Sequence, residues 1–191
     1  MGFIEVGSAS RGLKGPDGQP LLRQTYESNV VPQGVIIVQQ TVWPDDGGGS
    51  FKEVVRLTGG IVETAALREH GVSLRPAQIN VSVITPGTRR FWHVHPTQSE
   101  LWTVSYGQLN AGLVDCREDS PTLGVRTKVV LTPQTGVFIP AGVAHGYANE
   151  SASVAVLNYL PDRQFSRGDD SEEWRIDPDT LPYAFVLADI I

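Results

Sequence analysis

The sequence has a single cysteine, few charged residues (19%) and no long uninterrupted apolar stretch. The lone Cys116 excludes a disulfide within the chain and leaves the compartment open, with the cytosol preferred. The first residues lack the apolar segment of a signal peptide, and no run is long enough to span a bilayer. A net charge of -6 disfavours general attraction to nucleic acid or anionic lipid. We therefore expect a soluble, cytoplasmic protein whose partners are neither nucleic acid nor a membrane.

Twenty glycines and thirteen prolines divide the chain into short segments. Most segments are rich in Val, Ile, Thr and aromatic residues, which favours β-strands. The expected strands cover residues 34–43, 78–85, 89–95, 101–115, 126–131, 136–140 and 152–160. Residues 59–71 are the best helical candidate, with Gly71 as a C-terminal stop. Many short strands and little helix predict an all-β sandwich or barrel with one or two short helices.

A length of 191 residues fits one domain with a sizeable core. Residues 1–27 contain a Gly- and Ser-rich stretch that predicts a loop-like, partly mobile lead. Residues 28–191 are then expected to form the single domain. Within it, residues 161–180 are dense in Asp, Glu, Arg and Pro, which predicts an exposed connection before a final apolar stretch.

The four histidines are distributed unevenly, because His93 and His95 are separated by one residue. On a strand these two side chains point to the same side. Glu100 follows a turn and can return on the neighbouring strand, and His145 follows the turn in PAGVAHGYAN. Three imidazoles and one carboxylate suit a divalent transition metal. Four such ligands on an octahedral ion leave two positions for water, substrate or oxygen.

These residues resemble two motifs of the cupin superfamily. The stretch from Gly87 to Gly107 matches G-x5-H-x-H-x4-E-x6-G at every fixed position. The second motif, G-x5-P-x-G-x2-H-x3-N, is met except that Gln134 replaces its leading glycine. The resemblance implies a double-sheet jelly roll. It also implies one divalent metal (Fe, Mn, Ni, Co or Zn) held inside the barrel by His93, His95, Glu100 and His145.

Further segments extend the resemblance: DGGGSFKE (46–53), QINVS (78–82), DCREDSPTLG (115–124), IPAGVAHGY (139–147) and WRIDP (174–178). Over roughly residues 30–180 the chain resembles the dTDP-4-dehydrorhamnose 3,5-epimerases, a metal-free branch of the cupins. The resemblance implies substrate contacts by Glu53, Gln78, Asn80 and Arg90. Strand alternation alone would instead send Arg89 inward with His93.

In those epimerases a histidine, oriented by an aspartate, removes a proton next to a keto group, and a tyrosine protonates the opposite face. The resemblance makes His93 the base, provided that it is not a metal ligand. Counting from His145 without a gap places the tyrosine position on Asn158. Tyr159 is the neighbouring candidate acid, although alternation would turn it to the other face. The orienting aspartate should lie near the C-terminus, where Asp189 is the candidate.

Three positions depart from the epimerase pattern. Glu100 replaces a lysine, His95 replaces a glutamine two residues after the base, and Gly48 replaces an arginine expected to contact phosphate. The first two changes convert a metal-free acid–base site into the metal quartet. A histidine that serves as a metal ligand is no longer free to act as a base, so His93 takes one role or the other.

The leading hypothesis is a metal-dependent cupin enzyme related to sugar-nucleotide 3,5-epimerases, catalysing an isomerisation, epimerisation, cyclisation or elimination next to a carbonyl. One alternative is an Fe(II)-dependent oxygenase on the same four ligands. Another is a dTDP-4-dehydrorhamnose 3,5-epimerase with His93 as a free base, and a third is a non-enzymatic ligand-binding cupin. The expected substrate is a sugar nucleotide or keto compound. The resemblance also implies a homodimer that exchanges N-terminal strands.

Overall fold

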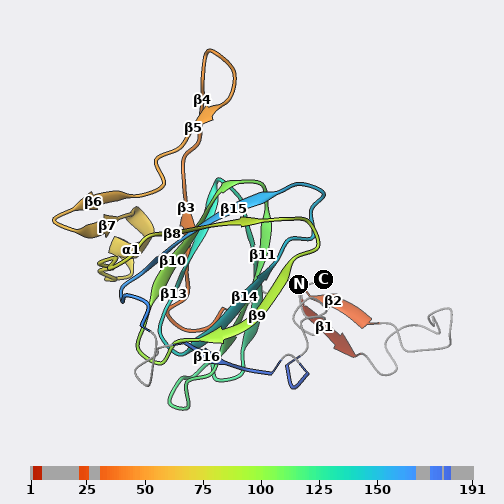
Figure 1. Cartoon of the computed structure of the whole chain (residues 1–191). Helices are drawn as coiled ribbons and strands as arrows, with labels where there is room; N and C mark the ends of the chain where they lie inside the picture. The colour runs from red at the N-terminus through yellow and green to blue at the C-terminus, as the bar shows by residue number, and fades with distance from the viewer. Residues whose placement is uncertain (1, 6–21, 26–30, 167–172, 178, 182–191) are drawn as a thin grey trace.

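Two antiparallel sheets face each other and enclose a barrel-like interior (Figure 1). The computed structural model describes residues 2–5, 22–25, 31–166, 173–177 and 179–181. In spatial order, the strands of the first sheet are β3 (Ile36–Gln39), β13 (Thr135–Ile139), β10 (Glu100–Tyr106), β15 (Ala155–Pro161) and β8 (Asn80–Ile84). Those of the second sheet are β12 (Arg126–Leu131), β11 (Leu109–Asp115), β14 (Val143–Ala148), β9 (Arg89–Val94) and β16 (Trp174–Arg175).

The main core lies between the two sheets, where both contribute side chains from their inner faces. Val104 and Val137 of the first sheet and Leu113 of the second are fully buried there. A tight turn at Gly107 carries the chain from β10 in one sheet to β11 in the other. Gly107 has a φ of +76°, and an added Cβ would collide with the backbone of Ala155. The segment expected as one strand over 101–115 is therefore two strands, one in each sheet.

Shorter elements surround the barrel. The small strands form three antiparallel pairs: β1 (Gly2–Glu5) with β2 (Leu22–Thr25), β4 (Trp43–Pro44) with β5 (Ser50–Phe51), and β6 (Arg56–Thr58) with β7 (Ile61–Glu63). The β4–β5 hairpin projects away from the barrel in Figure 1, and β6, β7 and the helix lie beside the first sheet. The small strands β1 and β2 occupy part of the expected lead, while residues 1, 6–21 and 26–27 lie outside the described residues.

The helix expected over residues 59–71 is shorter than predicted. Only α1 (Ala65–Glu69) is helical, because positive φ angles at Gly59 and Gly60 make a hairpin turn between β6 and β7 instead. Thr64 caps the helix by accepting a hydrogen bond from the backbone N–H of Leu67 at 3.1 Å. The predicted stop is confirmed, since Gly71 follows the C-cap with a φ of +68°.

The predicted all-β jelly roll is confirmed, and each expected strand range overlaps at least one observed strand. The sequence reading missed β14 because Pro140 and Gly142 mark that region as a turn. No helix among the described residues has the length and apolar character that crossing a bilayer requires.

Candidate active site

A cavity of about 330 Å³ lies between the sheets and receives polar side chains from both. Arg90, His93 and His145 line it from the second sheet, and Asn80 and Tyr159 line it from the first. A space of this size suits a small molecule.

His93 is held as a neutral imidazole with one nitrogen available. Its Nδ1 lies 3.0 Å from a carboxylate oxygen of Glu173, which also accepts a hydrogen bond from Arg175 at 2.7 Å. Burial lowers the pKa of His93 to about 4; nearby Arg175 and His145 also lower it, and Glu173 opposes them. The Nδ1–H therefore donates to Glu173 at neutral pH. The Nε2 is buried without a hydrogen-bond partner among the described residues, so its lone pair can accept a proton.

Glu100 and His145 form a buried pair that also lines the cavity, and His145 lies next to His93 across the β14–β9 pairing. The Nε2 of His145 lies 2.9 Å from Glu100 Oε1, and the indole N–H of Trp102 donates to the same oxygen at 2.7 Å. Burial alone would raise the pKa of Glu100, but the contacts with His145 bring it below its usual value. Burial alone would lower the pKa of His145, but Glu100 and the Val143 carbonyl raise it above its usual value.

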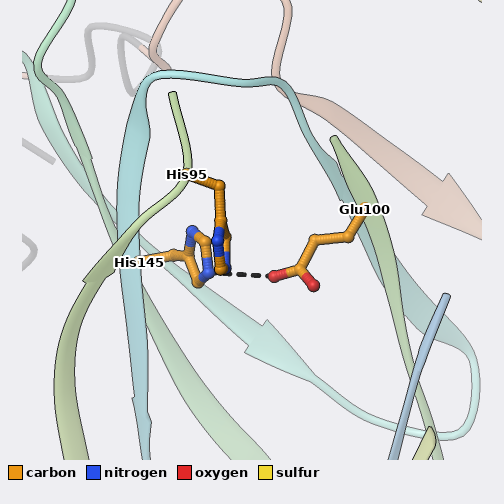
Figure 2. A group of neighbouring side chains, drawn as sticks. All are labelled: His95, Glu100 and His145. Carbon is orange, nitrogen blue, oxygen red and sulfur yellow. Dashed lines mark ion pairs between the residues drawn. The ribbon is translucent and has the colours of Figure 1, made fainter. Parts of the chain in front are cut away.

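The structure gathers three of the four expected metal ligands. Ligand atoms of His95, Glu100 and His145 all lie within 4.8 Å of one another (Figure 2). His93 is not part of this group, because its Nδ1 turns to Glu173, and its ring centroid lies 6.2 Å from that of His145. The complete quartet expected from the sequence is therefore reduced to a possible three-residue cluster.

A β-bulge decides which arginine faces the cavity. In the pairing of β14 with β9, His145 lies opposite His93 and Tyr147 lies opposite Arg90. Between these two pairs the chain advances three residues along β9 but only two along β14. The extra residue in β9 reverses which side chains point into the cavity. Arg90 lines the cavity as the resemblance implies, and Arg89 forms an ion pair with Glu150 at 3.3 Å.

Tyr159, not Asn158, is the β15 residue that faces the cavity. It pairs across the sheet with Trp102, which also lines the cavity. Asn158 lies on the other face and donates hydrogen bonds to Ser105 Oγ at 2.6 Å and to Thr103. The gapless count, which placed the inward position on Asn158, was therefore wrong by one residue, and the candidate Tyr159 faces the cavity.

The remaining predicted residues divide between the cavity and the surface. Gln78 and Asn80 line the cavity and are hydrogen-bonded to each other. Glu53 does not line it, because its carboxylate pairs with Arg56 at 2.8 Å beyond the β4–β5 hairpin. Asp189 lies outside the described residues. The sequence reading missed Glu173, whose only signal was its place directly before the WRIDP segment.

Two facing antiparallel sheets around a polar cavity place the chain among the cupin-type jelly rolls. The chain belongs to the dTDP-4-dehydrorhamnose 3,5-epimerase family, whose model matches residues 31–181. It is 30% identical over 151 residues to the spore coat polysaccharide biosynthesis protein SpsL of Bacillus subtilis, a match covering 76% of this chain and 91% of SpsL. A dTDP-4-dehydrorhamnose 3,5-epimerase of Mycobacterium tuberculosis is 33% identical over 104 residues, covering 49% of this chain and 52% of that enzyme.

A solved structure agrees with this assignment. The dTDP-6-deoxy-D-glucose-3,5-epimerase of Legionella pneumophila, in complex with dTDP-4-keto-L-rhamnose, is 27% identical with a TM-score of 0.63. The match covers 78% of this chain and 75% of that one. Relatives that are sugar epimerases favour the epimerase alternative over the leading metal-dependent hypothesis and over the oxygenase. They also favour an enzyme over a ligand-binding module.

Proposed function

We propose that the protein is a sugar-nucleotide epimerase that removes and returns a proton next to the keto group of a dTDP-4-keto-6-deoxy sugar. One observation carries the proposal. His93 on β9 and Tyr159 on β15 enter the same cavity from opposite sheets. A planar enolate between them would present one face to the imidazole and the other to the phenol. Removal of the proton at one face and its return at the other inverts the carbon.

The contacts and chemistry of the residues that line the cavity support a distinct role for each of them in this reaction. The carboxylate of Glu173 holds the Nδ1–H of His93, which leaves the lone pair of Nε2 directed away from that contact. The phenol of Tyr159 can donate a proton, which the amide of Asn158 cannot do. Gln78, Asn80 and Arg90 supply the hydrogen bonds that orient a sugar nucleotide, with Arg90 suited to an anionic group.

Solvent isotope exchange tests the proposal directly. Incubation of dTDP-4-keto-6-deoxyglucose with the protein in deuterium oxide is expected to place deuterium at C3 and C5, detected by mass spectrometry and proton NMR. His93→Asn should abolish exchange at both carbons. The matched control is His70→Asn, which removes an exposed imidazole at the end of α1 and should exchange normally. A His93→Asn protein that exchanges as fast as the control would exclude His93 as the base.

We also propose that the protein forms a homodimer. Support comes from β8, the edge strand of the first sheet, whose outward Val81 and Val83 are 62% and 69% exposed. Exposed apolar side chains on a sheet edge favour pairing with a second copy. Sedimentation equilibrium should give twice the chain mass for the parent protein and the chain mass for a Val81→Lys, Val83→Lys variant. A monomeric parent protein would contradict the proposal.

A further inference from the structure

Three potential metal ligands converge beside the proposed base. His95 directly follows β9, Glu100 begins β10 and His145 lies in β14, so both sheets contribute to the group. Figure 2 shows the two imidazoles side by side, facing the carboxylate. The 2.9 Å between His145 Nε2 and Glu100 Oε1 matches the separation of about 3 Å between neighbouring ligand atoms that lie roughly 2.1 Å from one ion at a right angle.

The hydrogen bonds around the group fix its donor atoms. The carbonyl of Val143 lies 3.0 Å from Nδ1 of His145 and accepts its hydrogen, so Nε2 points at the carboxylate. Both ring nitrogens thus face oxygen acceptors, which requires a cation at Nε2, either a proton or a metal ion. The indole of Trp102 fixes Glu100 from outside the group. Such outer partners are typical of metal centres, where they orient the ligands.

We infer that His95, Glu100 and His145 together bind one divalent transition-metal ion, and that His93 stays outside the coordination sphere as a free base. Two imidazoles and one carboxylate with open positions are a donor set that suits Fe, Mn, Co, Ni or Zn. The ion would supply positive charge near a substrate oxygen, at the position where Glu100 replaces the lysine of the resembled epimerases. The inference concerns binding and does not depend on the identity of the sugar.

Cobalt provides a readout that is independent of turnover. The chelator-treated protein is titrated with Co²⁺, and bound metal is followed by visible d–d absorption and by mass spectrometry after desalting. We expect one ion per chain in the parent protein. His95→Ala should weaken Co²⁺ binding by roughly 100-fold or more, because even outer-shell changes cost about 10–100-fold. Trp102→Phe, which removes the hydrogen bond to Glu100 together with part of the buried ring, should weaken Co²⁺ binding about tenfold.

The His93→Asn variant tests metal binding by three ligands against binding by four. It also distinguishes failure of this inference from failure of the proposed function. His93→Asn should bind Co²⁺ like the parent protein while it loses deuterium exchange, and His70→Ala should change neither. Near-ultraviolet circular dichroism checks that each variant is folded. Absence of stoichiometric Co²⁺ in the parent protein would overturn the inference. Loss of Co²⁺ in His93→Asn equal to that in His95→Ala would overturn the exclusion of His93.

Discussion

The phenol of Tyr159 is the group that the proposed mechanism requires to return the proton. Tyr159→Phe removes the acidic hydrogen and keeps the ring, so the cavity should hold its shape. We expect epimerised product to form about 10²–10⁴-fold more slowly, the usual contribution of a positioned acid. Product formation is measured by NMR with dTDP-4-keto-6-deoxyglucose as substrate.

Tyr106 provides the matched control for that substitution. Its side chain is 62% exposed and does not line the cavity, so Tyr106→Phe removes a phenol of no catalytic use. Its rate should equal that of the parent protein. Equal rates for Tyr159→Phe and Tyr106→Phe would show that another group delivers the proton.

Glu173 lies 3.0 Å from Nδ1 of His93, and in the proposed mechanism it acts by positioning that imidazole. Glu173→Gln can accept at one atom and donate at the other, so it no longer enforces the tautomer that frees Nε2. We expect kcat to fall by roughly 10²-fold with KM little changed, and Glu173→Asp to recover part of the loss. Steady-state kinetics measure the split, with Glu69→Gln on the exposed end of α1 as the control. A rise in KM with kcat unchanged would point to substrate binding instead.

Among the elements, β9 depends most on an irregularity. Its bulge at Phe91 and Trp92 packs against Gly146 of β14, where an added Cβ would collide with the ring of Phe91 and the carbonyl of Arg90. Gly146→Ala should therefore destabilise the fold by about 1–3 kcal/mol. It should also raise KM, since Arg90 loses its orientation.

Denaturant unfolding and steady-state kinetics check this expectation. The control is Gly47→Ala at the exposed tip of the β4–β5 hairpin, where an added Cβ meets nothing closer than 3.8 Å. A Gly146→Ala protein as stable as this control would mean that the bulge tolerates a side chain.

Comparison of the predicted and observed strands shows which parts of the site could be predicted from the sequence. Segments rich in Val, Ile, Thr and aromatic residues predicted most strands, and the period of two on a strand predicted that His93 and His95 point to the same side. The same period, counted from Asn158, wrongly turned Tyr159 away from the cavity. Arg90 was assigned only through the family resemblance, since a bulge reverses that period and depends on tertiary packing. Counting from His145 without a gap placed the tyrosine position on Asn158 instead of Tyr159, because it assumed a fixed loop length after β14. Glu173 reaches His93 through the β16–β9 pairing, which no local pattern encodes.

At the scale of the whole molecule, one buried carboxylate links the two sheets. Asp115, at the end of β11, accepts hydrogen bonds from Arg117 at 2.7 and 2.8 Å and from Ser120 at 2.6 Å. Arg117 also donates to the Gln33 carbonyl at 2.6 Å, just before β3 of the other sheet. The Arg117 hydrogen bonds hold the pKa of Asp115 well below its usual range, against the opposing effect of burial. Asp115→Asn should lower the free energy of unfolding by about 2–4 kcal/mol.

This stabilisation has a defined pH dependence. Because the folded pKa of Asp115 is lowered, its contribution is complete above the unfolded value of about 3.9 and is lost as pH falls toward the folded value. The stability gap between the parent protein and Asp115→Asn should shrink by about 1.4 kcal/mol per pH unit below that value. Urea unfolding at neutral and acidic pH measures the gap. A gap that stays constant would assign the effect to packing.

The placement of Trp102 gives the cavity an optical reporter. Its indole N–H donates to Glu100, and its ring lies edge-on to His145 with 5.2 Å between centroids. Two of the other three tryptophans, Trp43 and Trp174, are exposed and can be replaced by Phe without entering the core. Fluorescence would then come from Trp102 and the fully buried Trp92 alone. Each ligand that enters beside Trp102 would change the emission, so occupancy could be followed in real time without a label.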